Sequence, residues 1–174
     1  MWKIDIIRGG WKKRTQDIVC VIFNPFHQYD EVYKENPDPW LFEERTVIYM
    51  GTHRANSPFG CVYDQFSDDN FIVSMYLISK LQSQYTNDAI YVSRYLAKVV
   101  NANSGFGILI GRWREPYTGG VHPTEWHGSK EILGQYRRTL KPVKYAQCWV
   151  FGAILTTIAR SLGIPSRTIT NFSS

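Results

Sequence analysis

The stretch QCWVFGAILTTIARSLGIP, from Gln147 to Pro165, constrains the fold more than any other part of the chain. Apolar residues recur at helical spacing between Val150 and Leu162, which predicts a helix with one broad apolar face. Gly163 stands where a helix commonly ends in a left-handed residue, and the proline that follows would close the helix. Polar residues before the stripe place the start of this helix near Gln147 or Cys148.

The other apolar patterns predict an α+β fold that is rich in helices and has a few strands, placed toward both ends of the chain. Strands are expected at 17–23, 43–51 and 166–172. Helices are expected at 67–82, 91–105 and, more weakly, 128–138. Ser67 and Ser93 would cap the first two of these helices. The segments 24–40 and 54–66 are rich in turn residues, so we expect loops there.

A chain of 174 residues is long enough for one domain with its own core. No apolar run reaches the ~18 residues that would suggest a membrane span. The start, MWKIDIIRGGWKKRT, has no apolar stretch of signal-peptide length, so we expect a cytoplasmic protein.

The formal net charge is +5, and part of it comes from the cluster RGGWKKR at 8–14. We assign residues 1–17 to a basic N-terminal arm and residues 18–174 to the folded core. The arm could touch an acidic membrane, although a solvated arm is the simpler interpretation. We expect no nucleic-acid partner, because basic and aromatic residues do not alternate elsewhere in the chain.

The three cysteines, Cys20, Cys61 and Cys148, lie far apart and form no CxxC pair. This spacing argues against a disulfide framework and against a structural zinc site. Cys148 would stand in the first turn of the last helix, where unpaired N–H groups and the helix dipole favour a thiolate. The same N–H groups could hold an oxyanion. Alternatively, Cys148 is one more buried residue of a core helix. The residues by themselves leave both interpretations open.

The segment YAQCWVFGAILTTIARSLGIPSRTITN resembles the active-site segment of the eukaryotic transglutaminases. That family has a Tyr-Gly-Gln-Cys-Trp-Val-Phe run, then a helix, Leu-Gly-Ile-Pro-x-Arg and a Thr-Asn strand. The matching residues are Tyr145, Gln147, Cys148, Trp149, Val150, Phe151, Leu162, Gly163, Ile164, Pro165, Arg167, Thr170 and Asn171. Further upstream, VIFNPF, YDQFSDD, GILIGRW and HPTEWHGS also resemble family segments. The resemblance runs from about Ile18 to Ser174 and identifies these residues with the N-terminal part of the catalytic core.

The resemblance implies a truncated, papain-like transglutaminase core. It also implies protein-glutamine γ-glutamyltransferase activity, with protein glutamine and lysine side chains and small primary amines as substrates. Cys148 aligns with the nucleophile, and Trp113 with the tryptophan whose indole N–H stabilises the oxyanion. Gln147 and Trp149 would support the substrate and the oxyanion. For Trp113, the alternative is plain core packing.

In the family, the triad histidine and aspartate follow the Thr-Asn strand, in a region that would come after Ser174. No histidine of this chain matches a triad position; these are His27, His53, His122 and His127. A thiol without a base has no proton shuttle for the leaving ammonia. We therefore expect the chain to be a fragment that is inactive alone.

Calcium is the cofactor that the resemblance implies, and most of its ligands would lie beyond Ser174. One early site would map to Asn101 and Asn103, which supply amides but no carboxylate. The alternative is that both asparagines simply end a helix.

Two other functions fit less well. A non-catalytic, transglutaminase-like structural protein would lose the cysteine, whereas Cys148 and Trp113 are both present. Another papain-like cysteine hydrolase would not share the long upstream match. Three departures from the family pattern bear on the local backbone: Asp64 and Ala146 replace glycines, and Gly152 replaces an alanine.

Overall fold

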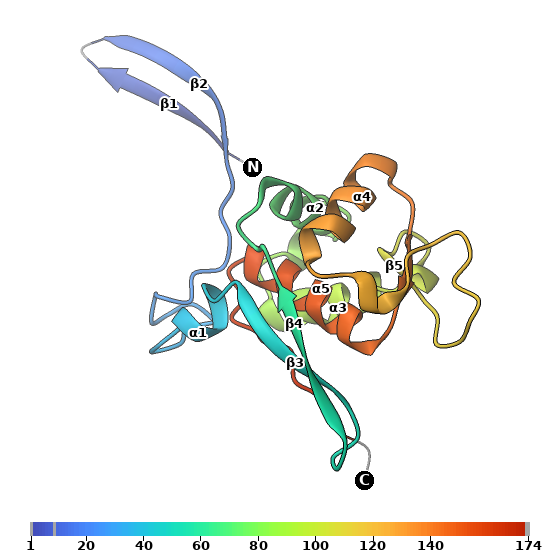
Figure 1. Cartoon of the computed structure of the whole chain (residues 1–174). Helices are drawn as coiled ribbons and strands as arrows, with labels where there is room; N and C mark the ends of the chain where they lie inside the picture. Colours follow the sequence, from blue (N-terminus) through green and yellow to red (C-terminus); the bar gives the residue numbers. More distant parts are fainter. Residues whose placement is uncertain (1, 9, 173–174) are drawn as a thin grey trace.

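The computed structural model describes residues 2–8 and 10–172 of the chain. It has the predicted α+β class, with helices in the majority (Figure 1). The strands are β1 (Trp2–Arg8), β2 (Trp11–Val19), β3 (Arg45–Gly51), β4 (Asn56–Val62), β5 (Leu109–Gly111) and β6 (Val143–Ala146). The helices are α1 (Asp38–Leu41), α2 (Asp68–Ile78), α3 (Ala89–Val99), α4 (Ser129–Thr139) and α5 (Cys148–Ser161), with short 3₁₀ helices η1 (Ser83–Tyr85), η2 (Ala102–Ser104) and η3 (Pro123–Glu125).

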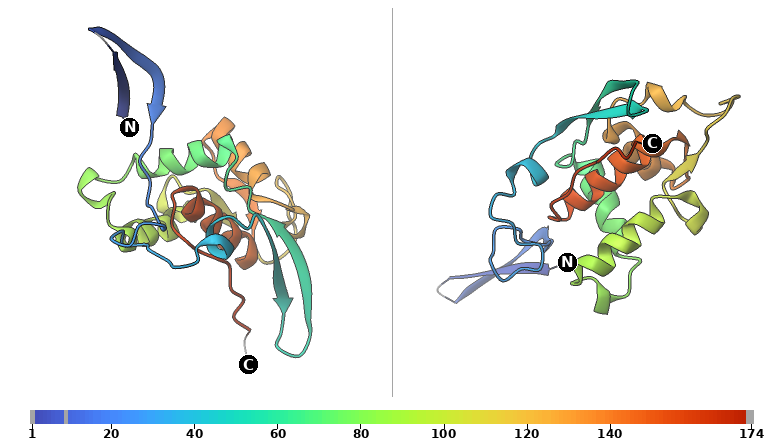
Figure 2. Two further views of the ribbon diagram at one scale, coloured as in Figure 1. Left: turned by 90° about the vertical axis from the view of Figure 1, so that its left-hand side faces the viewer. Right: turned by 90° about the horizontal axis from the view of Figure 1, so that it is seen from below.

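Helix α5 lies at the centre of the core and packs against α2, α3, α4 and β6. Figure 2 shows it from two further sides; seen from below, α3 lies on one side of it and the β3–β4 ribbon on the other. Ile154 and Ile158 on α5 are completely buried. The helix begins at Cys148, as predicted, and Gly163 beyond its end has φ +83°. A Cβ at Gly163 would lie 2.0 Å from the carbonyl oxygen of Phe23, so only glycine fits there.

The polar side chains of α5 are buried as well, which the apolar stripe did not predict. The hydroxyl of Thr157 donates to the carbonyl of Tyr63 at 3.0 Å, and that of Ser161 donates to the carbonyl of Gln65 at 2.8 Å. These bonds help to satisfy the buried backbone carbonyls of this turn, and the side chain of Asn70 also donates to the carbonyl of Tyr63. Asp64, between the two carbonyls, has φ 50°, in the left-handed region that favours glycine. This backbone explains why glycine occupies the position in the family pattern.

Arg160 ties α5 to the segment before β3. It is only 3% exposed, and burial lowers the pKa of its guanidinium although Tyr63 and Glu43 act in the opposite direction. The guanidinium donates to the carbonyls of Glu43 and Pro39 and to that of Ser166. It also lies 4.6 Å from the ring centroid of Tyr63. Carbonyl oxygens and an aromatic face therefore compensate a buried cation.

The strands form three separate pairs within the described residues: β1–β2 and β3–β4 are antiparallel, and β5–β6 is parallel. The β1–β2 hairpin projects away from the helices (Figure 1). It contains most of the predicted basic arm, but β2 continues through residues 18 and 19, so the proposed boundary after residue 17 falls inside a strand. That boundary stays a prediction.

The predicted buried strand at 17–23 is wrong beyond Val19. Val21 and Ile22 are 76% and 42% exposed. The chain here crosses the outside of the core, where the N–H of Phe23 donates to the carbonyl of Leu162 at the end of α5. This backbone contact takes the place of a strand ladder.

Two further strand assignments need correction. The segment 54–66, predicted as a loop, contains β4, which pairs with β3 from Asn56 to Val62. A two-stranded ribbon leaves each strand with an open edge, and such an edge tolerates Pro58. The segment 166–172, predicted as a strand, has no ladder; its contact with β3 is a bond from the Thr170 hydroxyl to the carbonyl of Tyr49.

Helix α2 begins after the predicted cap, because the Ser67 side chain accepts from the N–H of Asn70. Helix α3 begins earlier than predicted: Asp88 is its N-cap and accepts from the N–H of Tyr91, whereas Ser93 lies within the helix. Helix α4, expected to be weak, is 11 residues long, as long as α2 and α3. None of the helices in the described residues is long and apolar enough to cross a membrane.

The start of α3 can be tested by comparing two substitutions. Asp88→Ala should lower the free energy of unfolding by about 1 kcal/mol, because it removes the cap of α3. Ser93→Ala should change it by less than about 0.5 kcal/mol, because Ser93 is exposed and caps nothing. Urea denaturation measures both values. A larger loss for Ser93→Ala would place the start of the helix where the sequence pattern put it.

Candidate active site

Cys148 is the first residue of α5, and its side chain is exposed. This exposure contradicts the alternative of a buried core cysteine. Within α5, the N–H groups of Val150 and Phe151 donate to the carbonyl of Gln147. The N–H groups of Cys148 and Trp149 come before this ladder and have no intrahelical acceptor. The thiol therefore stands at an open helix N-terminus.

Trp113 follows β5 and is 63% exposed, so plain core packing does not account for it. Its indole lies parallel to the ring of Phe151 on α5, with ring centroids 6.5 Å apart and an interplanar angle of 8°. Gly111 stands beside both rings: a Cβ there would lie 2.6 Å from two carbon atoms of the indole and 3.3 Å from the ring of Phe151. The indole and the thiol are thus brought to the same end of α5, because Phe151 is one helical turn after Cys148.

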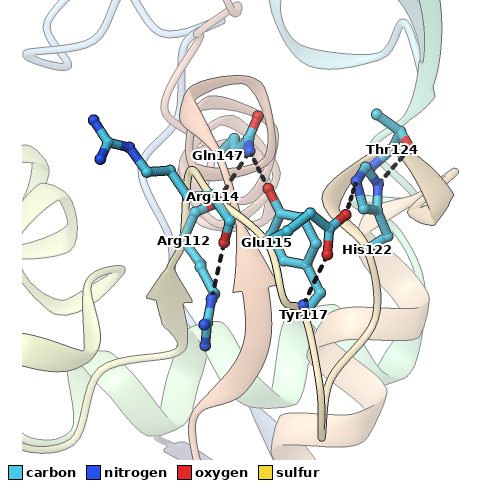
Figure 3. Close-up of polar contacts among 7 residues, drawn as sticks. All are labelled: Arg112, Arg114, Glu115, Tyr117, His122, Thr124 and Gln147. Atoms are coloured by element: carbon cyan, nitrogen blue, oxygen red, sulfur yellow. Dashed lines mark hydrogen bonds and ion pairs between the residues drawn. The ribbon is translucent and has the colours of Figure 1, made fainter.

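Hydrogen bonds join the loop that carries Trp113 to the residues just before the thiol. The N–H of Arg112 donates to the carbonyl of Ala146 at 3.0 Å. Gln147 Nε2 donates to the carbonyl of Arg112 at 3.1 Å and to the hydroxyl of Tyr117 at 2.9 Å (Figure 3). Ala146 itself is fully buried in β6 and does not have a positive φ, so its Cβ fits where the family pattern has glycine.

Aromatic and polar contacts surround Tyr117. The centroid of its ring lies 4.5 Å from that of His122, in a T-shaped arrangement, and 5.8 Å from that of Tyr145. The His122 ring lies 2.7 Å from the hydroxyl of Thr124 through Nδ1 and 3.8 Å from Glu115 through Nε2 (Figure 3). The N–H of Tyr117 donates to Glu115 as well, at 3.2 Å.

The described histidines all make contacts away from the thiol. His122 contacts Thr124 and Glu115, and the ring of His27 accepts from the N–H of Tyr29. His53 lies in the turn between β3 and β4, and the carbonyl of His127 accepts from Val62. Among the described residues, no histidine hydrogen-bonds to the Cys148 thiol.

The other two tryptophans of the predicted site, Trp126 and Trp149, have different surroundings. Trp126 is buried and donates its indole N–H to the carbonyl of Tyr145 at 2.8 Å. Trp149 is half-buried, and its Nε1 is shielded from solvent without a hydrogen-bond partner among the described residues. Trp149 and Cys61 line the same small pocket. Burial, followed by the charge of Asp64, raises the pKa of Cys61 to about 11.

The loop expected to bind calcium is a single 3₁₀ turn, η2. The side chain of Asn101 accepts from the N–H of Asn103 at 3.0 Å and so caps this turn. No group of three or more His, Cys, Asp or Glu side chains suited to a metal occurs in residues 2–8 and 10–172. Calcium prefers several oxygen ligands that include carboxylates. These residues do not fit a calcium site by themselves.

The sequence did not predict a role at the site for Gly111 or Tyr117, nor the contact of Phe151 with Trp113. The pairing of β5 with β6 brings Gly111 beside Ala146 and Tyr117 to Gln147, although at least 30 positions of the chain separate the members of each pair. Only the GRW run hinted that this region mattered.

Comparison with known proteins gives several close matches. The crystal structure of red sea bream transglutaminase has a TM-score of 0.78 and 37% sequence identity, over 83% of this chain and 24% of that one. Protein-glutamine gamma-glutamyltransferase 2 of Pagrus major is 39% identical over 167 residues, which is 88% of this chain. Protein-glutamine gamma-glutamyltransferase 5 of Homo sapiens is 37% identical over 184 residues, and Annulin of Schistocerca americana is 33% identical over 184 residues.

The chain spans 24% to 26% of the length of these three relatives. No family profile matches it. The identities nevertheless extend over 88% to 99% of the chain, and the solved relative shares its α+β fold. The chain belongs to the transglutaminase family.

Proposed function

We propose that this chain carries the nucleophile and one oxyanion donor of a protein-glutamine γ-glutamyltransferase, with Cys148 and Trp113 in these roles. The main support is the exposed thiol at the N-terminus of α5, beside a loop that is bonded to the preceding residue. The substrates would be a glutamine side chain of a protein and an amine, either a lysine side chain or a small primary amine.

In the first half of the reaction, the Cys148 thiolate attacks the carbonyl carbon of the glutamine side chain. A C–S bond forms, and the carbonyl π electrons move to oxygen, giving an oxyanion. The oxyanion collapses, the C–N bond breaks, and the nitrogen leaves as ammonia after taking a proton. The product is a thioester of the glutamyl group with Cys148.

In the second half, the amine attacks the thioester carbon. A C–N bond forms, the C–S bond breaks, and the amine loses one proton as the thiol is restored. The acyl acceptor can also be water, which converts the glutamine to glutamate.

Both halves pass through an oxyanion. The N–H groups at the first turn of α5 and the indole N–H of Trp113 would donate hydrogen bonds to this oxyanion. The roughly two-thirds exposure of Trp113 leaves its indole free to meet a substrate. Gln147 and Trp149 flank the thiol and complete the walls of the site.

The proton steps need a base that can also act as an acid. No described histidine contacts Cys148, so the residues described here offer the nucleophile without such a group. The proposed reaction has no step that uses calcium, because Asn101 and Asn103 do not by themselves form a site for it.

The reactivity of the thiol can be tested with two peptides. In the first, a chloromethyl ketone replaces the carboxamide of a glutamine; in the second, it replaces that of an asparagine, one methylene shorter. We expect the glutamine-length peptide to alkylate Cys148 faster, because its longer side chain carries the reactive chloromethyl ketone to the thiol at the helix terminus. Trp113→Phe should slow the reaction at least about tenfold by removing the indole donor. Mass spectrometry of tryptic peptides identifies the labelled cysteine.

Cys61 serves as an internal control in this experiment. It is buried and its pKa is raised to about 11, so at pH 8 it is almost wholly a protonated thiol. It should remain unlabelled, and Cys148→Ala should abolish labelling. Equal rates for the two peptides, or preferential labelling of Cys61, would contradict the proposal.

Catalytic turnover gives a separate prediction. The 174-residue chain should not incorporate a fluorescent primary amine into a glutamine-containing protein, with or without calcium, because no histidine of the described residues hydrogen-bonds to the thiol. Incorporation above background that Cys148→Ala removes would show that the chain supplies its own base.

A further inference from the structure

We propose that Gln147 and Tyr117 form a clasp that holds the Trp113 loop against the N-terminus of α5. Both are then positioning residues that act through Trp113. The functional meaning of this clasp rests on the proposed role of Trp113, but its existence does not.

The hydrogen bonds of Gln147 define its role. It occupies the N-cap position of α5, yet its side chain makes no capping bond. A side-chain amide nitrogen carries two hydrogens. Gln147 Nε2 gives one to the carbonyl of Arg112 and the other to the hydroxyl of Tyr117. No N–H of this side chain is left for an oxyanion, which favours positioning over direct stabilisation.

The two acceptors stand at opposite ends of the loop that carries Trp113. Arg112 precedes the tryptophan directly, and Tyr117 follows it by four residues. Gln147 therefore links the two ends of the loop through its two hydrogen bonds (Figure 3). The N–H of Arg112 donates to the carbonyl of Ala146 and the carbonyl of Arg112 accepts from Gln147, so both peptide groups that flank Arg112 are held. Short loops with fixed ends have few alternative conformations.

Tyr117 is itself held in place. His122 and Tyr145 pack against its ring, and Glu115 accepts from its N–H. These contacts direct the hydroxyl toward Gln147, as Figure 3 shows.

The clasp fixes the position of the indole on a surface that Gly111 and Phe151 shape. Gly111 leaves room that a Cβ would fill, and Phe151 offers a parallel ring. Stacking of the exposed indole on the half-buried ring of Phe151 is weak by itself, on the order of 1 kcal/mol. The loop must therefore be held for the indole to stay on this surface.

The test uses the ¹⁵N-labelled 174-residue chain and the indole N–H signal of Trp113, identified by its loss in Trp113→Phe. Gln147→Leu keeps the approximate side-chain volume but removes both bonds of the clasp. In this variant, we expect the signal to move toward its position in the urea-unfolded chain. Tyr117→Phe removes one bond and should move the signal less, in the same direction.

Two further variants calibrate the shift. Gly111→Ala should displace the indole directly while leaving both bonds of Gln147 intact. Tyr91→Phe removes an exposed hydroxyl on α3, far along the chain, and should leave the Trp113 signal unmoved. The signal of buried Trp126, which donates to Tyr145, reports whether the fold survives each substitution.

The proposal is overturned if Gly111→Ala moves the Trp113 signal but Gln147→Leu and Tyr117→Phe do not. If Gln147→Leu also moves the Trp126 signal, this substitution has disturbed the fold. The test then rests on whether Tyr117→Phe moves the Trp113 signal. Failure of the chloromethyl ketone to label Cys148 in the unsubstituted chain would count against the proposed function and leave the clasp intact.

Discussion

Helix α5 is buried on nearly all sides, and its packing organises the core. Its apolar residues fill the core, but Thr157, Arg160 and Ser161 are also buried and require acceptors. Carbonyl groups of the turn around Asp64 and of the segment before β3 supply them. Burying polar groups is tolerable only when their hydrogen bonds are made. The packing of α5 therefore fixes the turns on one side of the core as firmly as the apolar contacts fix the helices.

A helix so fixed has only its ends available for chemistry. The N-terminal end presents Cys148 and two N–H groups without intrahelical acceptors, and the parallel pair β5–β6 brings the Trp113 loop to the same end. The proposed clasp at Gln147 would join these two parts. In this account, a rigid helix positions the thiol and a short, bonded loop positions the indole, which agrees with the demand that catalytic groups be preorganised.

Sequence reasoning succeeded where one element determines its own pattern. The extent of α5, the cap at Ser67 and the strand ending at Gly51 follow from local residues, and all three are confirmed. It failed where contacts with a segment distant in the sequence determine the local conformation. Segment 17–23 is apolar but crosses the outside of the core, and β4 forms despite its turn-rich sequence because β3 lies beside it. For the site, the family motif pointed to Cys148 and Trp113, whereas Tyr117 and Gly111 become relevant only through strand pairing and a side-chain bond.

Folding around α5 should place the Cys148 thiol and the Trp113 indole at one surface. Paramagnetic broadening tests this directly. A nitroxide would be attached at Cys148 in a chain with Cys20→Ser and Cys61→Ala, and the indole N–H signals would be compared before and after reduction of the label. We expect strong broadening for Trp113 and a detectable signal for Trp40, which lies near the opposite end of α5, where Arg160 bonds to Pro39. A Trp113 signal broadened no more than that of Trp40 would contradict this placement.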